Sequence, residues 1–122
     1  MLRDFTYIDD ITESLFRLLH KPPVINKLFN KKDPDPSSSW APYKVFNIGN
    51  SNPIQLMKFI EALEIELGVE ACKDFMPMQP GDVQETFADT SSLEEWIDFK
   101  PKTSISDGIA KFVAWYREFY KV

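Results

Sequence analysis

The sequence predicts an α/β fold with few short strands and three main helices. Apolar residues recur at helical spacing over residues 11–19, 56–67 and 105–120, which indicates three helices that each present one apolar face. Short segments rich in β-branched and aromatic residues lie between them, and Lys44–Ile48 is the clearest of these. Glycine and proline punctuate the chain between the two kinds of segment.

The chain is expected to open with a strand that leads directly into a helix. Arg3–Ile8 alternates and is rich in strand-forming residues. Asp9 and Asp10 follow, and their carboxylates can cap a helix by accepting hydrogen bonds from free backbone amides. We expect this helix to run to about His20, where two prolines follow. Its predicted inward face consists of Ile11, Leu15, Leu18 and Leu19.

Residues 21–43 are expected to form a long loop within the domain. The segment contains adjacent charged residues, several prolines and three consecutive serines, which cannot build a core. A loop of this length is either loose or functional. Its composition favours a loose or disordered surface loop.

A strand and a helix are predicted next. Lys44–Ile48 carries apolar groups on both faces, which is typical of a strand in a parallel sheet that is covered on both sides. Asn52 is the expected N-cap of a helix whose first residue is Pro53. The helix should continue through Leu67, because Gly68 suits the left-handed residue that ends many helices.

The last third of the chain predicts two short strands and two helices. The strands are expected near Cys72–Met76 and around 85–88, with a tight loop over residues 77–82 between them. A brief helix, Ser91–Trp96, should follow a cap at Asp89 or Thr90, and Thr103 or Ser104 should cap the final helix. The predicted core stripe of that helix is Ile105, Ile109, Phe112, Val113, Tyr116, Phe119 and Tyr120.

Composition bounds the class of protein. The 122 residues suffice for one domain, and a net charge of -5 argues against a nucleic-acid partner. The single cysteine, Cys72, excludes an internal disulfide, fits a reducing compartment and is expected to be packed in the fold. No apolar run approaches the roughly 20 residues that span a bilayer, and the N-terminus lacks a signal-peptide layout. We therefore expect a soluble, cytoplasmic protein.

The sequence contains no recognisable catalytic group. The four glycines are scattered, so no glycine-rich loop for a dinucleotide is present. No tyrosine has a lysine four residues later, and the carboxylates show no metal-ligand spacing. His20 is the single histidine and is expected to cover a helix C-terminus rather than to abstract protons.

Two features can bind a ligand. Arg3 stands at the entry of the first predicted strand, where a guanidinium can hold a diphosphate with two hydrogen bonds. The loop from Gln79 to Asp82 contains Gly81, which permits a sharp turn, and Asp82 can accept hydrogen bonds from the two hydroxyls of a ribose. Taken without other information, Arg3 also reads as an ordinary surface charge and the loop as an ordinary aspartate-stabilised turn.

Five motifs in order resemble a known family. Together they are similar to the C-terminal third of NAD-dependent nucleotide-sugar epimerases and dehydratases, which belong to the extended short-chain dehydrogenase/reductase superfamily. The resemblance is greatest to UDP-glucuronate 4-epimerases, because galactose epimerases tend to have an arginine where Gln79 stands. The motifs are Arg-Asp-Phe-Thr-Tyr-Ile-Asp-Asp-Ile (3–11), Val-Phe-Asn-Ile-Gly-Asn (45–50), Met-Gln-Pro-Gly-Asp-Val (78–83), Ala-Asp-Thr-Ser (88–91) and the pair 103–109 and 112–117.

The resemblance implies that residues 1–122 are the C-terminal substrate-binding domain of a larger enzyme. In that parent, bound NAD takes a hydride from C4 of the sugar while a tyrosinate removes the hydroxyl proton, and the 4-keto sugar is then reduced on its other face. The NAD-binding loop and the Tyr-x-x-x-Lys pair are expected in a preceding Rossmann core that this chain lacks. The resemblance assigns Arg3 to the UDP diphosphate, Asp82 to the ribose and Gln79 to the vicinity of the nucleotide.

The expected partners are a UDP-sugar, the N-terminal Rossmann domain and further copies of this chain. If Lys44–Ile48 belongs to the sheet of the Rossmann domain, the piece alone exposes a sheet edge that favours self-association. It is expected to be inactive alone, with no cofactor, metal or catalytic residue of its own. A non-enzymatic truncated fragment is the alternative, as is a part of a UDP-galactose epimerase, a dehydratase or a decarboxylase.

Overall fold

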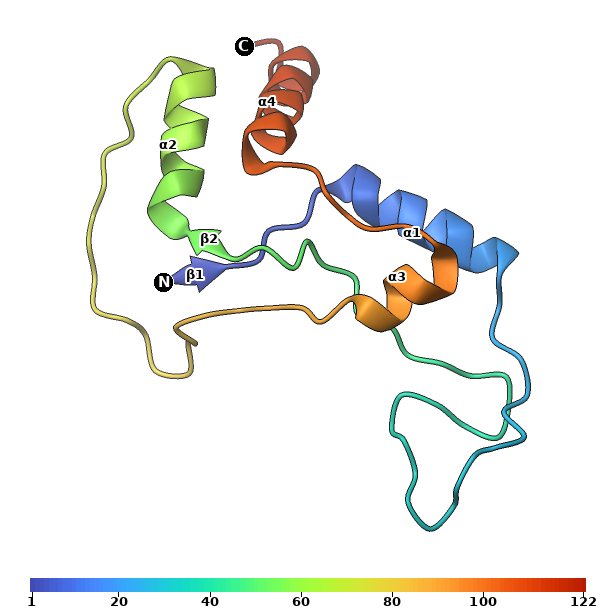
Figure 1. Ribbon diagram of the computed structural model, residues 1–122. Helices are drawn as coiled ribbons and strands as arrows, with labels where there is room; N and C mark the ends of the chain where they lie inside the picture. The colour runs from blue at the N-terminus through green and yellow to red at the C-terminus, as the bar shows by residue number, and fades with distance from the viewer.

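The computed structural model describes residues 1–122 as four helices and a two-stranded sheet. The strands β1 (Leu2–Arg3) and β2 (Ile54–Gln55) pair antiparallel, with Leu2 opposite Gln55. Figure 1 shows two groups of helices joined by extended chain: α2 and α4 stand side by side at one end, and α1 and α3 lie together at the other. The bounds of the helices are Ile8–His20 for α1, Leu56–Leu67 for α2, Ser91–Ile97 for α3 and Ile105–Tyr120 for α4.

Helix α1 ends where the sequence predicted and begins earlier. Its N-cap is Tyr7, so Asp9 and Asp10 lie in the first turn instead of capping the helix. Both carboxylates still lie at the positive end of the helix dipole. His20 is the last residue of α1, as predicted, and its Nδ1 atom lies 2.9 Å from the carbonyl oxygen of Phe16.

Helix α2 begins later than predicted. Residues 54–55 are extended because they pair with β1, so the N-cap is Gln55 and the expected cap at Asn52 is wrong. The C-terminal prediction is confirmed, since Gly68 has φ 70 and its N–H donates to the carbonyl of Glu64. Glycine adopts this left-handed backbone at no steric cost, which explains the end of the helix there.

The two C-terminal helices begin close to the predicted residues. Ser104 caps α4, and its hydroxyl accepts a hydrogen bond from the N–H of Asp107 at 3.1 Å. Thr90 occupies the N-cap position of α3, but its hydroxyl donates to the carboxylate of Glu94 instead of capping. α3 is one residue longer than predicted and ends at Ile97.

Most of the predicted strands do not form. The strand predicted at Arg3–Ile8 is reduced to β1, and Lys44–Ile48 contributes one isolated bridge, from Lys44 to Ser38. No strand forms over 72–76, and 85–88 supplies a single bridge from Glu85 to Leu2. A strand needs a neighbour along its length to satisfy its backbone amides, and 44–48 and 85–88 each have a bridge at only one residue.

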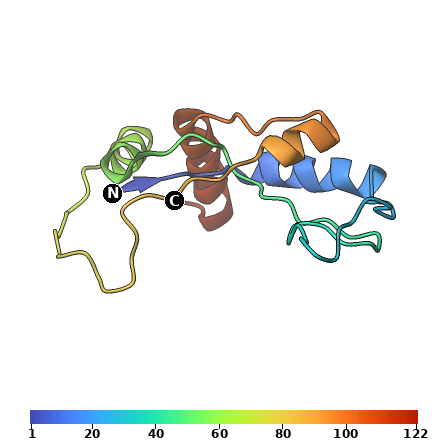
Figure 2. The same cartoon turned by 60° about the horizontal axis from the view of Figure 1, so that its bottom comes forward.

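The segment 21–43 contains no helix and no named strand. It projects from the α1–α3 end of the molecule, as Figures 1 and 2 show. Trp40 and Tyr43, near its end, are both more than half exposed. The loop is therefore attached to the fold mainly through its two ends.

The hydrophobic core is small and lies in α3 and α4. Its buried apolar side chains are Leu93, Ile97, Ile109 and Val113. The predicted inward face of α1 is wrong at Leu15 and Leu19, which are 50% and 79% exposed, because the buried positions of α1 are Asp10 and Ser14.

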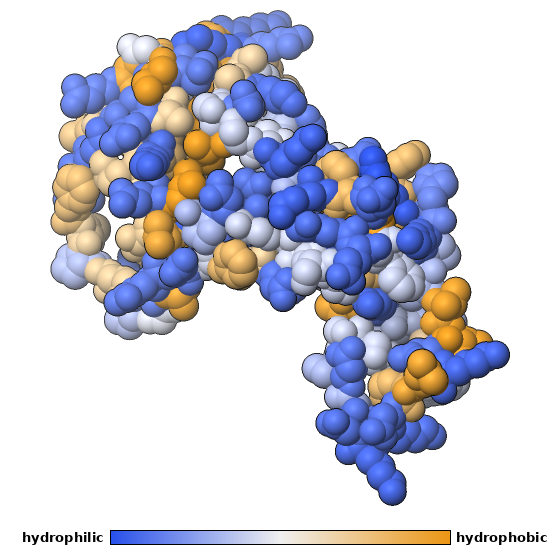
Figure 3. Space-filling view, viewed as in Figure 1, coloured by the Kyte–Doolittle hydropathy of each residue, from blue (hydrophilic) through white to orange (hydrophobic).

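Other residues that were expected to be packed are exposed. Tyr116, Phe119 and Tyr120 of the predicted α4 stripe reach solvent, and so does Cys72, because residues 72–76 form no strand. Phe112 is also exposed. Figure 3 accordingly shows apolar side chains on the surface near α2 and α4 and near the 21–43 loop.

Candidate functional site

The candidate site is formed by β1 and the segment that follows the 77–82 loop. The N–H of Leu2 donates to the carbonyl of Gln84 at 2.9 Å, and the N–H of Thr86 donates to the carbonyl of Leu2 at 3.2 Å. These two bonds align residues 84–86 with β1 on the edge opposite to β2. The loop that precedes residue 84 is thereby held beside the side chain of Arg3.

Arg3 and Asp82 form an ion pair in this site. The Nη2 atom of Arg3 lies 2.6 Å from Oδ1 of Asp82, and Nη1 donates to the carbonyl of Leu2 at 2.9 Å. The same Oδ1 atom accepts a hydrogen bond from the N–H of Val83 at 2.9 Å. The side chains are 20% and 39% exposed, so the pair is accessible to a ligand from solvent.

Gln79 belongs to the same turn but does not join the ion pair. Its backbone carbonyl accepts a hydrogen bond from the N–H of Asp82 at 3.1 Å, and Gly81 has φ 90 within the turn. The Gln79 side chain is exposed and forms no hydrogen bond. The structure therefore brings Arg3 and Asp82 into contact and leaves the Gln79 amide free beside them.

Asp4 fixes the chain next to Arg3, a role that the sequence pattern did not indicate. Its carboxylate accepts hydrogen bonds from the backbone N–H groups of Ser51, Asn52 and Ala88 at 3.0, 3.3 and 3.2 Å. Gly49 lies in the same contact, where an added Cβ would stand 2.4 Å from the Cβ of Ala88. The glycine in this turn was the available signal, because it marks a close approach between two segments.

Asp10, at the start of α1, also accepts backbone hydrogen bonds from a distant segment. It is 8% exposed, and its Oδ2 atom accepts hydrogen bonds from the N–H groups of Lys102 and Thr103 at 3.3 and 2.9 Å. The two carboxylates connect the N-terminal segment to the turns before α2 and α4. They support the position of β1 and take no part in the Arg3 site itself.

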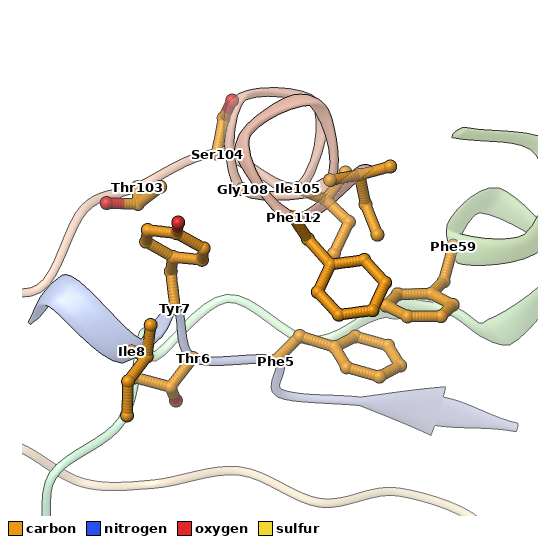
Figure 4. Close-up of a pocket in the computed structure, with 11 residues that line it drawn as sticks. Phe5, Thr6, Tyr7, Ile8, Phe59, Thr103, Ser104, Ile105, Gly108 and Phe112 are labelled. Atoms are coloured by element: carbon orange, nitrogen blue, oxygen red, sulfur yellow. The ribbon is translucent and has the colours of Figure 1, made fainter. Parts of the chain in front are cut away.

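A separate apolar cavity of about 290 Å³ lies between the N-terminal segment, α2 and α4 (Figure 4). The rings of Phe5 and Phe59 stack there with centroids 4.4 Å apart. Tyr7 packs against Gly108, where an added Cβ would lie 3.1 Å from the ring. No charged side chain lines this cavity, so it offers no cation to pair with a phosphate.

The perturbed pKa values lie outside the Arg3 site. The hydrogen bond from Lys73 lowers the pKa of Glu64, and the hydroxyl and N–H of Ser91 lower the pKa of Asp89. No group of three or more histidine, cysteine, aspartate or glutamate side chains could hold a metal ion. No helix has the length and apolar character needed to cross a membrane. The Arg3 site itself offers a cation and a carboxylate for polar contacts.

The sequence is similar to bacterial proteins over almost its whole length. It is 58% identical to "Protein CapI" of Staphylococcus aureus and 45% identical to a "Probable UDP-glucuronate 4-epimerase" of Rhizobium meliloti, with 99% of this chain and 36% of each relative aligned. The chain thus spans about a third of the length of these relatives. No family model matches the sequence.

Solved structures share the fold. The UDP-glucuronic acid 4-epimerase of Bacillus cereus, in complex with NAD, aligns with a TM-score of 0.68 and 26% identity over 98% of this chain and 31% of that enzyme. The UDP-glucose 4-epimerase of Bifidobacterium longum, in complex with NAD+ and UDP, aligns with a TM-score of 0.72 and 20% identity over 94% of this chain and 30% of that enzyme.

The short strands and the four helices match the fold of the C-terminal portion of extended short-chain dehydrogenases/reductases of the epimerase and dehydratase type. Within that superfamily, the chain is similar to UDP-glucuronate 4-epimerases. The enzyme of that name from Arabidopsis thaliana, UDP-glucuronate 4-epimerase 1, is 36% identical to it over 98% of the chain.

Proposed function

We propose that this chain is the substrate-binding domain of an NAD-dependent UDP-glucuronate 4-epimerase. In this proposal Arg3 binds the diphosphate of the UDP-sugar, Asp82 binds the ribose hydroxyls and Gln79 lies beside the nucleotide. The observation that carries the proposal is the contact between Arg3 and Asp82, since the fold brings a cation and a carboxylate that are 79 residues apart into one accessible site. A guanidinium suits phosphate oxygens, and a carboxylate suits a pair of hydroxyls.

The residues present do not fit NAD. The four glycines occupy separate turns and one helix, and the small sheet is antiparallel, so no glycine-rich turn joins a parallel strand to a helix. We propose that NAD binds to a Rossmann domain outside these residues and that the chain alone does not catalyse epimerisation. The bound NAD of the B. cereus and B. longum enzymes supports the first part of this proposal.

Ligand titration tests the binding role. Isothermal titration calorimetry of the chain with UDP and with UDP-glucuronate should give Arg3-dependent binding, so Arg3→Ala should weaken both affinities by about tenfold or more. Lys31→Ala is the matched control, because it removes one exposed positive charge from the 21–43 loop, where the lysine side chain forms no ion pair. Equal affinities for the Arg3 variant and the unmodified chain would contradict the assignment.

A chimera tests the epimerase role. The chain should replace the matching segment of the R. meliloti relative, to which it is 45% identical. Conversion of UDP-glucuronate to UDP-galacturonate should be retained by the chimera and absent from the chain alone. If a folded chimera is active only on UDP-galactose, or only as a dehydratase or decarboxylase, the proposal of glucuronate epimerisation is wrong and that reaction takes its place.

The exposed apolar surface supports a second proposal, that the isolated chain self-associates. Apolar side chains are exposed on two helices. On α1 these are Leu15, Phe16 and Leu19, and on α4 they are Trp115 and Phe119. Such surfaces favour contact with a further domain or with a second copy. Light scattering over a dilution series should show dimers or larger species, whereas a monomer at every concentration would argue against self-association.

A further inference from the structure

Asp82 occupies the Arg3 guanidinium that the proposed function assigns to a phosphate. Its Oδ1 atom lies 2.6 Å from Nη2, within the range of a charge-assisted hydrogen bond. An incoming phosphate that binds Nη2 competes with this carboxylate, and one that binds the remaining N–H groups of the guanidinium lies beside the carboxylate's negative charge. The N–H of Val83 keeps this negative charge in place.

We propose that Asp82 is a specificity-determining residue that favours nucleoside diphosphates and disfavours bare diphosphates. The inference rests on the proposed function of the site. Inorganic pyrophosphate can displace the carboxylate from Arg3, but it offers no donor to Asp82 in return. The displaced carboxylate is then left beside a second anion, and like charges at this separation repel.

A nucleoside diphosphate can bind both members of the ion pair. Its phosphate oxygens take the guanidinium, while its ribose hydroxyls donate hydrogen bonds to the carboxylate that the guanidinium releases. Asp82 is 39% exposed and its Oδ2 atom forms no hydrogen bond within the candidate site, so it can receive a hydroxyl. One ion pair thus distinguishes two ligands that carry the same diphosphate group.

Asp82→Asn separates this role from a simple contact to ribose. Asparagine retains an oxygen for the N–H of Val83 and removes the negative charge. Calorimetric titration of the full chain should show that the variant binds pyrophosphate on the order of tenfold more tightly than the unmodified chain does, while UDP binding weakens. High salt should reduce the gain for pyrophosphate, because salt screens the repulsion that the variant removes.

The control is Asp33→Asn, which removes one exposed negative charge from the 21–43 loop and should change neither affinity. If UDP binds in an Arg3-dependent manner but Asp82→Asn leaves pyrophosphate binding unchanged or weaker, the specificity role is wrong and the proposed function stands. If the unmodified chain binds UDP with an affinity that Arg3→Ala does not alter, the proposed function fails and the specificity role fails with it.

Discussion

Replacing Asp4 by alanine removes the one side chain that accepts backbone hydrogen bonds from two distant segments beside β1. Its carboxylate accepts from Ser51, Asn52 and Ala88 at 3.0 to 3.3 Å. Two of the three bonds are partly buried and one is exposed, so we assign about 1 kcal/mol to each, which is below the roughly 1.5–3 kcal/mol of a hydrogen bond to a charged group. The expected loss is therefore about 2–3 kcal/mol, a large fraction of the stability of a small domain.

Urea denaturation followed by tryptophan fluorescence measures this loss. Asp4→Asn should cost less than Asp4→Ala, because the amide retains one acceptor oxygen. Asp33→Ala is the matched control, since Asp33 lies in the exposed 21–43 loop and should change the unfolding free energy by less than about 0.5 kcal/mol. A loss in Asp4→Ala no larger than that of the control would refute the view that this carboxylate holds the segments together.

Three further substitutions have expected outcomes of their own. Gly49→Ala should destabilise the chain by about 1–3 kcal/mol in the same assay, since its Cβ would stand 2.4 Å from that of Ala88; an unchanged midpoint would show that the turn adjusts freely. Ser104→Ala should cost about 1 kcal/mol through loss of the α4 cap, and an unaltered α4 in hydrogen exchange would contradict this. The hydrogen bond from Lys73 lowers the pKa of Glu64, so the stability that this pair contributes to the fold is present above the usual glutamate pKa and is lost as pH falls through the lowered value. Glu64→Gln should therefore reduce the loss of stability at low pH. Identical stability–pH profiles for the variant and the unmodified chain would count against the pair.

The helices were largely predictable from the sequence because their signals are local. The apolar spacing, the Ser104 cap and the left-handed Gly68 each act within one or two turns, and each is found in the structure. The start of α2 was misplaced for a tertiary reason. Pairing with β1 holds Ile54–Gln55 extended, which no pattern within residues 49–55 could indicate.

Strands and burial were less predictable because they depend on neighbours. Lys44–Ile48 has the composition of a strand, yet no second strand lies beside it to complete a ladder. Periodicity located the apolar faces of α1 and α4 but could not say what covers them, so Leu19 and Phe119 are exposed instead of packed.

The candidate site depends partly on residue types that the sequence shows and partly on contacts between distant segments that it does not show. Arg3 and Asp82 could be named from their residue types and from the family resemblance, but their mutual contact could not, since it depends on a backbone register between segments 79 residues apart. The supporting carboxylates, Asp4 and Asp10, resemble ordinary turn and first-turn aspartates in the sequence. Their partners lie more than 45 and 90 residues away respectively.

The placement of β1 has a consequence for how the chain folds. The N–H of Asp4 bonds to the hydroxyl of Thr86 across 82 residues, and closing a flexible loop of that length costs about 4 kcal/mol of entropy beyond the constant term. Helices such as α1 and α4 close only short loops and can form first. The strand should therefore order late in folding, after the helices and together with the site that it carries.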